Sequence, residues 1–552
     1  MLLRKLKNCI FPLMKKSPHI GIILLVFTQF LLAIGNYQDY GLHWDDYSTR
    51  VIGANNALLA NQRLDYFLIS EDKVKELAES KMSRPDKSDY LSLDSLENYE
   101  LSQYGAFFEL VLMGIEWVSG LDSFHSIFYA RHLTVHLFYL VGIVFFYFLL
   151  FQQFHNWKIS LLGALILLLC PRIFAHSFFN TKDIPFLTAC ILATFSFFQL
   201  AKSPGYRNAL LHAFFCAIAI DTRIIGLVFP GLSLVLYFNL MVGTKKWKYF
   251  LLQGGFYLLV TGLLVILFWP YLWQNPLGHI LFTLESMSKY PWYGSLVFMG
   301  QLYQPIDFLP WYYFPVWFVI SIPLFYFLGF FLFFVQLFRQ SPNSLLVPGS
   351  PLQFQVFALA LFFLPWGVAI IRQSVLLDDW RHFYFVYPFF VIMVITGFHW
   401  MKTRFSIADK LFYLGIAIPL IWIMFKMIQL HPYQYIYTNA LVNKPIAEQF
   451  EVDYWGLSYK NGLEFLVQHE PKGLLKVAIA EEPGETNALV LKQTDRERIN
   501  FVTLEEATYF MTAYREVLDR KDYLEKKGIR PDQELYQVKV GREVLLSVFK
   551  LK

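Results

Sequence analysis

The sequence predicts a polytopic α-helical membrane protein with a small extracytoplasmic α/β domain at its C-terminus. Of its 552 residues, 56% are hydrophobic and 19% are aromatic, which is well above the average of a soluble protein. Several apolar runs reach the ~20 residues that a helix needs to cross a bilayer. Charge follows the same pattern, because basic residues collect in alternate short loops and acidic residues collect in the others.

About eleven transmembrane helices are expected, with boundaries good to a few residues. The expected spans are 19–35, 128–151, 159–178, 184–201, 208–220, 224–242, 249–269, 314–338, 354–372, 383–400 and 408–428. The basic N-terminus and the apolar run after it resemble a signal peptide. That run ends in Gly35-Asn36-Tyr37 without a small-residue cleavage pattern, so we expect an uncleaved first helix.

The positive-inside rule fixes the orientation and places the N-terminus in the cytoplasm. The segments then assigned to the cytoplasm contain Arg4, Lys5, Lys7, Lys15, Lys16, Lys158, Lys202, Arg207, Lys245, Lys246, Lys248, Arg339, Lys402 and Arg404, with Asp409 as the acidic exception. The opposite orientation would put all these clusters outside. The division expected is a membrane domain at 1–430, with outer loops 36–127 and 270–313, and an outer α/β domain at 431–552.

The first outer loop has two parts of different composition. Residues 61–103 are charged, compatible with a helix and expected to be solvated. The stretch Tyr104–Val118 is apolar and aromatic but too short to span, and it contains Glu109 and Glu116. A helix lying in the membrane interface fits it better.

After residue 430 the composition becomes that of a soluble domain. The β-prone runs are Leu474–Ala480, Asn500–Val502, Leu535–Val540 and Val544–Phe549, and Glu505–Leu518 resembles a helix. The net charge of +5 comes from short clusters between apolar spans, so nucleic acid is not an expected partner. Three of the four cysteines lie within apolar runs, and no disulfide framework is implied.

Acidic residues gather on the outer side of the membrane. Asp45 and Asp46 follow the first span by a few residues, beside Trp44 and Tyr47. One of two adjacent carboxylates can act as a general base while the other raises its pKa or orients it. A helix N-cap with solvated acids explains the pair equally well.

Asp183 and Asp221 belong to the same outer group. Asp183 precedes Pro185 at the start of the fourth span, as a helix cap would. It also falls on the same side and at a similar depth as Asp45, which a shared site requires. A charged group at the edge of a helical bundle is costly, and this favours a functional role.

Arginine residues near the outer ends of the spans are candidates for binding a phosphate. The candidates are Arg131, Arg223, Arg381 and His382, and Arg172 and Arg372 also lie near outer ends of expected spans. Arginine binds phosphate through two parallel hydrogen bonds. Snorkelling to lipid headgroups is the alternative for any one of them.

The outer loop 270–313 is rich in aromatic residues and proline. Trp292-Tyr293 and Trp311-Tyr312 are its main aromatic pairs. An interfacial aromatic belt explains part of this composition. Aromatic faces also stack on sugars, so the loop is a candidate lid over a substrate.

Four short motifs resemble the GT-C superfamily of membrane glycosyltransferases, which contains protein O-mannosyltransferases and aminoarabinose transferases. They are Trp44-Asp45-Asp46-Tyr47, Lys182-Asp183-Ile184-Pro185, Leu309-Pro310-Trp311-Tyr312-Tyr313-Phe314-Pro315 and Trp380-Arg381-His382-Phe383. The tail His431-Pro432-Tyr433-Gln434-Tyr435 and Asp453-Tyr454-Trp455-Gly456 are also similar to bacterial members. The family pattern has Asp-Glu where this chain has Asp45-Asp46, so either carboxylate remains a candidate base.

The resemblance implies an inverting glycosyltransferase in a bacterial inner membrane. The donor would be a polyprenyl-phosphate-linked sugar, and the acceptor a glycan, a lipid or a protein at the outer face. Asp45 would act as the base, and arginine would stabilise the phosphate leaving group. A divalent metal ion bridging Asp45 and Asp183 to the phosphate stays open as a cofactor, although the sequence contains no further ligand cluster.

Two other classes of function compete with this one. A transporter or flippase for a lipid-linked or small polar substrate would place its ionisable residues at mid-membrane, in repeat-related broken helices. Here the acids collect at outer helix ends, and no internal repeat is visible. A membrane scaffold with an outer binding domain would leave the acidic pair at Asp45 and Asp46 without a purpose.

Overall fold

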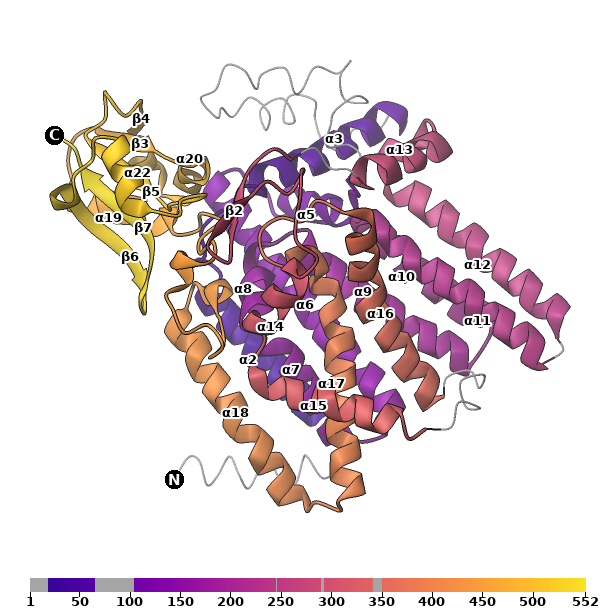
Figure 1. The fold of residues 1–552 in the computed structure, drawn as a ribbon. Helices are drawn as coiled ribbons and strands as arrows, with labels where there is room; N and C mark the ends of the chain where they lie inside the picture. The colour runs from indigo at the N-terminus through magenta and orange to yellow at the C-terminus, as the bar shows by residue number, and fades with distance from the viewer. Residues whose placement is uncertain (1–17, 65–103, 245, 289–291, 341–349) are drawn as a thin grey trace, which may run out of the picture.

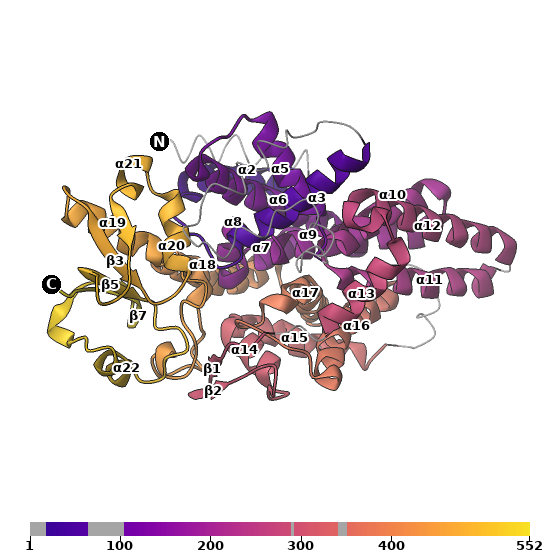
Figure 2. The same cartoon turned by 90° about the horizontal axis from the view of Figure 1, so that it is seen from above.

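The computed structural model describes residues 18–64, 104–244, 246–288, 292–340 and 350–552. The chain forms a bundle of long helices with a smaller sheet-containing domain at one side (Figures 1 and 2). The helices of the bundle are α2 (Ile20–Asn36), α6 (Phe124–Phe154), α7 (Trp157–Leu168), α8 (Pro171–Phe179), α9 (Asp183–Lys202), α10 (Tyr206–Thr222), α11 (Val228–Thr244), α12 (Trp247–Phe268), α14 (Tyr313–Ser321), α15 (Leu324–Leu337), α16 (Pro351–Arg372), α17 (Tyr387–Arg404) and α18 (Asp409–Leu430). Two 3₁₀ turns, η3 (Ile224–Leu227) and η6 (Arg381–Val386), lead into α11 and α17.

These helices agree with the predicted polytopic membrane fold. Among the described residues, seven helices are long and apolar enough to cross a membrane, and nine spans result if each of two bent pairs counts as one. The remaining two predicted spans correspond to α2 and α10, each of 17 residues.

The two bent pairs depart from the straight spans expected at 159–178 and 314–338. The pair α7 and α8 bends by 68°, and the pair α14 and α15 by 115°. Each bend lies at a proline, Pro171 in the first and Pro323 in the second. Proline has no N–H to donate and clashes with the preceding turn, so it interrupts the helical ladder at these positions.

Contacts at one end of the bundle join segments that the charge rule places on the cytoplasmic side. Lys158 and Lys402 lie 2.6 Å and 2.7 Å from the carboxylate oxygens of Asp409. The acidic exception among the basic loops therefore pairs with two of their lysines. These contacts bring the start of α7 together with the end of α17 and the start of α18.

The opposite end of the bundle is covered by shorter elements (Figure 1). They are α3 (Asp46–Leu64), α5 (Phe107–Val118), η4 (Pro270–Trp273), α13 (Pro276–Ser288) and the hairpin of β1 (Leu296–Phe298) and β2 (Gln301–Tyr303). A helix at Tyr104–Val118 was expected, and α5 forms it. Most of the charged stretch 61–103 lies outside the described residues.

The C-terminal domain is a five-stranded sheet with short helices. Its elements are α19 (Tyr459–His469), β3 (Leu475–Ile479), α20 (Pro483–Asn487), η9 (Ala488–Val490), α21 (Gln493–Arg496), β4 (Ile499–Phe501), β5 (Tyr509–Thr512), α22 (Arg520–Lys526), η10 (Pro531–Gln533), β6 (Glu534–Val540) and β7 (Glu543–Lys550). The strand order is β4-β3-β5-β7-β6, and β3 runs parallel to both of its neighbours. The link to α18 contains η7 (Gln434–Ile436) and η8 (Ile446–Glu448).

The prediction of a helix at Glu505–Leu518 is wrong, because the central strand β5 lies inside it. All four residues of β5 are buried. A fully buried strand shows no alternation of polar and apolar residues, so its pattern cannot be distinguished from that of a buried helix. The four other strands fall within a residue or two of the β-prone runs.

The sheet domain is docked on the helical part through the loop that follows α2. The Asn487 side chain accepts a hydrogen bond from the Leu42 N–H at 2.8 Å and donates one to the Leu42 carbonyl at 2.7 Å. A Cβ on Gly41 would lie 2.4 Å from the Leu457 carbonyl oxygen, so this close approach requires glycine. The docking fixes the position of Trp44, Asp45 and Asp46 a few residues further on.

Candidate active site

The two adjacent aspartates have different environments. Asp46 is 1% exposed, and its Oδ2 accepts a hydrogen bond from the His43 N–H at 2.8 Å at the start of α3. Burial raises the pKa of Asp46 well above its ordinary value. Asp46 is therefore a buried side chain that stabilises the first turn of α3.

Asp45 has the properties of a charged reactive group. Its side chain is 33% exposed and lines a cavity. Burial by itself would raise the pKa of Asp45, but the charges of Lys182 and Arg381 outweigh it and hold the pKa below the ordinary value. Asp45 is therefore ionised at neutral pH, as a general base must be.

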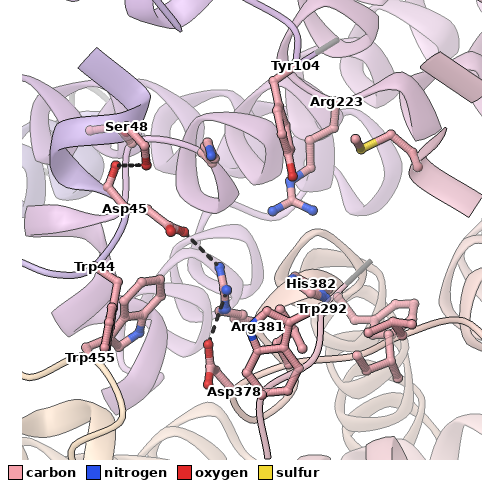
Figure 3. Close-up of a pocket in the computed structure, with 18 of the residues that line it drawn as sticks. Trp44, Asp45, Ser48, Tyr104, Arg223, Trp292, Asp378, Arg381, His382 and Trp455 are labelled. Carbon is pink, nitrogen blue, oxygen red and sulfur yellow. Dashed lines mark hydrogen bonds and ion pairs between the residues drawn. The ribbon is translucent and has the colours of Figure 1, made fainter. Parts of the chain in front are cut away.

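Asp45 and Asp183 come together at one guanidinium group, that of Arg381, and Figure 3 shows its contact with Asp45. Arg381 Nη1 lies 3.6 Å from Asp45 Oδ2 and 3.7 Å from Asp183 Oδ2. Arg223 also pairs with Asp183, and the Asn180 amide donates to Asp183 at 2.8 Å. Two residues 138 positions apart in the sequence therefore share one charged centre.

The centre opens into a cavity of about 900 Å³. Its charged lining consists of Asp45, Glu109, Lys182, Arg223, Asp378, Arg381, Glu481, Glu482, Arg515, Glu516 and Lys527, with His382 beside them. Its apolar lining includes Ile224 and Ile225 in η3 and Pro365, Val368 and Ala369 in α16. Val368 is 55% exposed and Ile225 is 41% exposed, so this apolar wall is accessible and is not packed against other helices.

Six of the predicted site residues take no part in the lining formed by the described residues. They are Asp46 and Asp183, which lie behind the lining, together with Arg131 and the aromatic residues Tyr293, Trp311 and Tyr312. Asp221, which the sequence grouped with the outer acids, also lies outside it. Asp221 is fully buried at the end of α10, and its neighbours Thr222 and Arg223 line the cavity instead.

Arg131 belongs to a buried ion network. Its Nη1 donates to Glu109 at 2.8 Å and its Nε donates to Glu116 at 2.6 Å, while Arg50 pairs with Glu116 at 3.0 Å. Arg131 is 1% exposed. The pairing of Arg131 with two carboxylates of α5 argues against the prediction that it binds a donor phosphate.

The predicted lid is only partly over the cavity. Trp292 lines it, as Figure 3 shows. Tyr293 is 77% exposed and Trp311 is 66% exposed, and the Tyr312 ring lies 6.0 Å from that of Phe298 in the hairpin. Tyr290 and Pro291 lie outside the described residues.

Other aromatic side chains of the cavity come from segments outside the predicted lid. Trp44 and Trp455 line it, together with Tyr104. The Arg381 guanidinium lies over the Trp455 ring at 4.5 Å, and the Arg515 guanidinium lies over the Trp44 ring at 4.7 Å. Cation–π contacts of this kind fix the planes of both arginines.

Several charged residues of the cavity lining have no assigned role in the sequence interpretation. Among them, Lys182 stands in a motif there without a function, and Asp378 and Arg515 are given no role. Arg515 reaches from the loop after β5 to Asp378 at 3.4 Å and donates to the Tyr454 carbonyl at 3.0 Å. The sequence signal that could have drawn attention to Asp378 is the density of charge in Asp378-Asp379-Trp380-Arg381-His382. In the structure both aspartates adopt positive φ, an uncommon backbone geometry.

Among the residues that the structure describes, no group of three or more His, Cys, Asp or Glu side chains is arranged to hold a metal ion. The positive charge between Asp45 and Asp183 comes from Arg381. The donor set therefore fits a guanidinium-bridged pair of carboxylates, and a bridging divalent ion stays a prediction to be tested.

The chain is similar to two crystal structures of ArnT from Cupriavidus metallidurans. One is bound to undecaprenyl phosphate, with 14% identity, a TM-score of 0.49 and coverage of 96% of this chain and 98% of that chain. The other is in the apo state, with 13% identity, a TM-score of 0.49 and coverage of 97% and 98%. No protein-family model and no curated protein matches the chain.

Proposed function

We propose that the protein is an inverting glycosyltransferase that moves a sugar from a polyprenyl-phosphate carrier to an acceptor at the outer face of a bacterial inner membrane. One observation carries the proposal. An ionised aspartate, Asp45, faces a cavity that also contains Lys182, Arg223 and Arg381, and the cavity has an apolar wall formed by η3 and α16. A base, an anion site and a lipid contact are the three parts that this chemistry needs.

The donor phosphate fits the basic side of the cavity. Lys182, Arg223, Arg381 and His382 line it beside Asp45. A phosphate oxygen is a strong acceptor for guanidinium and ammonium groups. The prenyl chain would follow the apolar wall formed by η3 and α16, where the side chains of Ile225 and Val368 are accessible.

The transfer needs one base and a cationic pocket. Asp45 accepts the proton of the acceptor hydroxyl or amine, and the freed electron pair attacks the anomeric carbon of the sugar. The bond between that carbon and the phosphate oxygen breaks on the opposite face, so the anomeric configuration inverts. The phosphate leaves with the bonding electrons and is stabilised by Arg381, Arg223 and Lys182, which removes the need for a strong general acid.

The acceptor is a glycan, a lipid or a protein. The C-terminal domain supplies part of the cavity through Glu481, Glu482, Arg515, Glu516 and Lys527. These groups lie after the carboxyl ends of the parallel strands β3 and β5 and directly after α22, and loops at such strand ends commonly hold ligands. The C-terminal domain is therefore the proposed acceptor side.

Reconstitution in proteoliposomes with radiolabelled polyprenyl-phosphate sugars tests the proposal. Asp45→Asn should lower turnover by about 10²–10⁴-fold, the usual contribution of a positioned base. Asp39→Asn is the matched control, since Asp39 lies in the same loop but pairs with His431 at 2.8 Å. Asp45→Asn turnover equal to wild type would contradict the assignment of the base. Movement of labelled lipid across the bilayer without sugar transfer would favour a flippase.

A further inference from the structure

A chain of hydrogen bonds runs from the proposed site into the protein interior. It begins at Asp183, passes through Asn180, His176 and Tyr454, and ends at Asp379. Asn180 Nδ2 lies 2.8 Å from Asp183 Oδ2 and 3.0 Å from His176 Nδ1. His176 Nε2 lies 3.3 Å from the Tyr454 hydroxyl, which donates to Asp379 Oδ2 at 2.9 Å. His176 is fully buried, as is Tyr454 apart from 1% of its surface.

The backbone fixes the direction of the chain at Asn180. Its Oδ1 accepts from the N–H groups of Lys182 and Asp183 at 3.1 Å and 2.7 Å. The amide nitrogen must then point to His176 and Asp183, because the two ends of an amide cannot both accept. His176 Nδ1 therefore accepts a hydrogen bond, and the neutral ring carries its proton on Nε2. The Tyr454 hydroxyl accepts a hydrogen bond from His176 Nε2–H and donates one to Asp379 Oδ2.

Asp379 anchors the far end. Its Oδ2 also accepts from Arg172 at 2.8 Å and from the Tyr384 hydroxyl at 3.1 Å. Burial raises the pKa of Asp379 to about 6, although Arg172 and Tyr454 act against it. At neutral pH the group is thus an acceptor, as the direction of the chain requires.

Tyr454 also contacts the segment that contains Asp45. Its backbone carbonyl accepts from the Trp44 indole N–H at 2.8 Å and from Arg515 at 3.0 Å. Trp44 is the residue before Asp45. One residue therefore orders Asp45 through its carbonyl and Asp183 through its hydroxyl.

We propose that Tyr454 is a positioning residue that sets the relative placement of Asp45 and Asp183, acting on Asp183 through the Nε2–H tautomer of His176 and the Asn180 amide. The inference rests on the proposed function for its kinetic consequence, but the tautomer does not depend on any activity. The segment Asp453-Tyr454-Trp455 thereby becomes part of the site: Asp453 accepts from the Leu457 and Ser458 N–H groups at the start of α19, and Trp455 supports Arg381.

Solid-state ¹⁵N NMR of histidine-labelled protein in lipid tests the proton arrangement, with His176→Gln identifying the signal. We expect His176 to be neutral with a protonated Nε2 and an accepting Nδ1 in the wild type. Asn180→Asp should move the proton to Nδ1, since a carboxylate accepts where the amide donates. An Nδ1–H tautomer or a doubly protonated ring in the wild type would overturn the proposal whatever reaction the protein catalyses.

Kinetics of two tyrosine variants test the positioning role. Tyr454→Phe and Tyr384→Phe each remove one hydroxyl donor to the same Asp379 oxygen, but only the first breaks the link to His176. Tyr454→Phe should lower kcat by about 10²-fold, as a displacement of catalytic groups by about 1 Å does, with little change in the donor KM. Tyr384→Phe should stay close to wild type.

The remaining outcomes overturn the proposal in distinguishable ways. Equal losses in both variants would show that Asp379 has only a structural role, and a raised KM with unchanged kcat would make Tyr454 a binding residue. Wild-type protein that transfers no sugar from any polyprenyl-phosphate donor would remove the proposed function and the positioning role together. The tautomer of His176 would still be measured in that case.

Discussion

Replacing Arg381 by glutamine should move the acidic limb of the pH–rate profile to higher pH. A base works only when it is deprotonated, and in the wild type the pKa of Asp45 is held below its ordinary value. Burial is the largest influence on Asp45 and acts to raise its pKa. Removing a cation that opposes burial must therefore raise the pKa, so kcat/KM should fall off at a higher pH in the variant.

The distance between the groups sets the size of the shift. At the 3.6 Å between Arg381 and Asp45, a pair of unit charges interacts by about 5 kcal/mol at an effective dielectric constant of about 20, and by about 1 kcal/mol in bulk water. The Asp45 side chain is 33% exposed, so solvent screening places the value toward the lower figure. With about 1.4 kcal/mol for each pKa unit, we expect a shift of about one to two pH units.

The assay is kcat/KM of the reconstituted protein as a function of pH. Arg223→Gln provides a graded comparison, because Arg223 has a smaller influence on Asp45 than Lys182 or Arg381. The acidic limb of Arg223→Gln should move in the same direction as that of Arg381→Gln, but by less. The acidic limb of Lys182→Gln should move by at least as much as that of Arg381→Gln. An unchanged limb in Arg381→Gln, or a shift to lower pH, would refute the account of how Asp45 is kept ionised.

Three other predictions concern the buried Arg131, the need for a divalent ion, and the tryptophans of the outer loop 270–313. Arg131→Met should destabilise the fold by about 3–5 kcal/mol, because it leaves buried Glu109 and Glu116 short of a partner, and thermal unfolding in detergent should show it; a raised donor KM with unchanged stability would instead make Arg131 a phosphate ligand. Chelation of divalent ions should leave turnover unchanged, since Arg381 supplies the charge between Asp45 and Asp183; a loss that added magnesium or manganese restores would establish a metal. Trp292→Ala should raise a substrate KM and Trp311→Ala should not, because only Trp292 lines the cavity; equal effects would contradict this placement.

The proximity of Asp45 to Asp183 is predictable from the sequence because it depends on hydropathy and charge. Each aspartate follows or precedes a span by a few residues, and counting spans with the positive-inside rule places both at one end. Arg223 and Arg381 follow from the same count. The structure brings these segments into one cavity, and it brings Lys158, Lys402 and Asp409 together elsewhere in the bundle.

The features that sequence reasoning missed depend on tertiary contacts. Nothing local distinguishes Arg131 from Arg381, and the difference arises because α5 turns Glu109 and Glu116 toward Arg131. The contributions of Arg515 and Tyr454 depend on how the C-terminal domain docks, which no periodicity records. The difference between Asp45 and Asp46 is also tertiary, since Asp46 is covered while Asp45 faces the cavity.

A cryo-EM structure of the protein with a non-hydrolysable polyprenyl-phosphate sugar analogue would test the central claim most directly. We predict that the phosphate lies among Lys182, Arg223 and Arg381, that the anomeric carbon faces Asp45, and that the prenyl chain follows η3 and α16. A phosphate bound outside this cavity, or an analogue whose sugar lies away from Asp45, would contradict the claim.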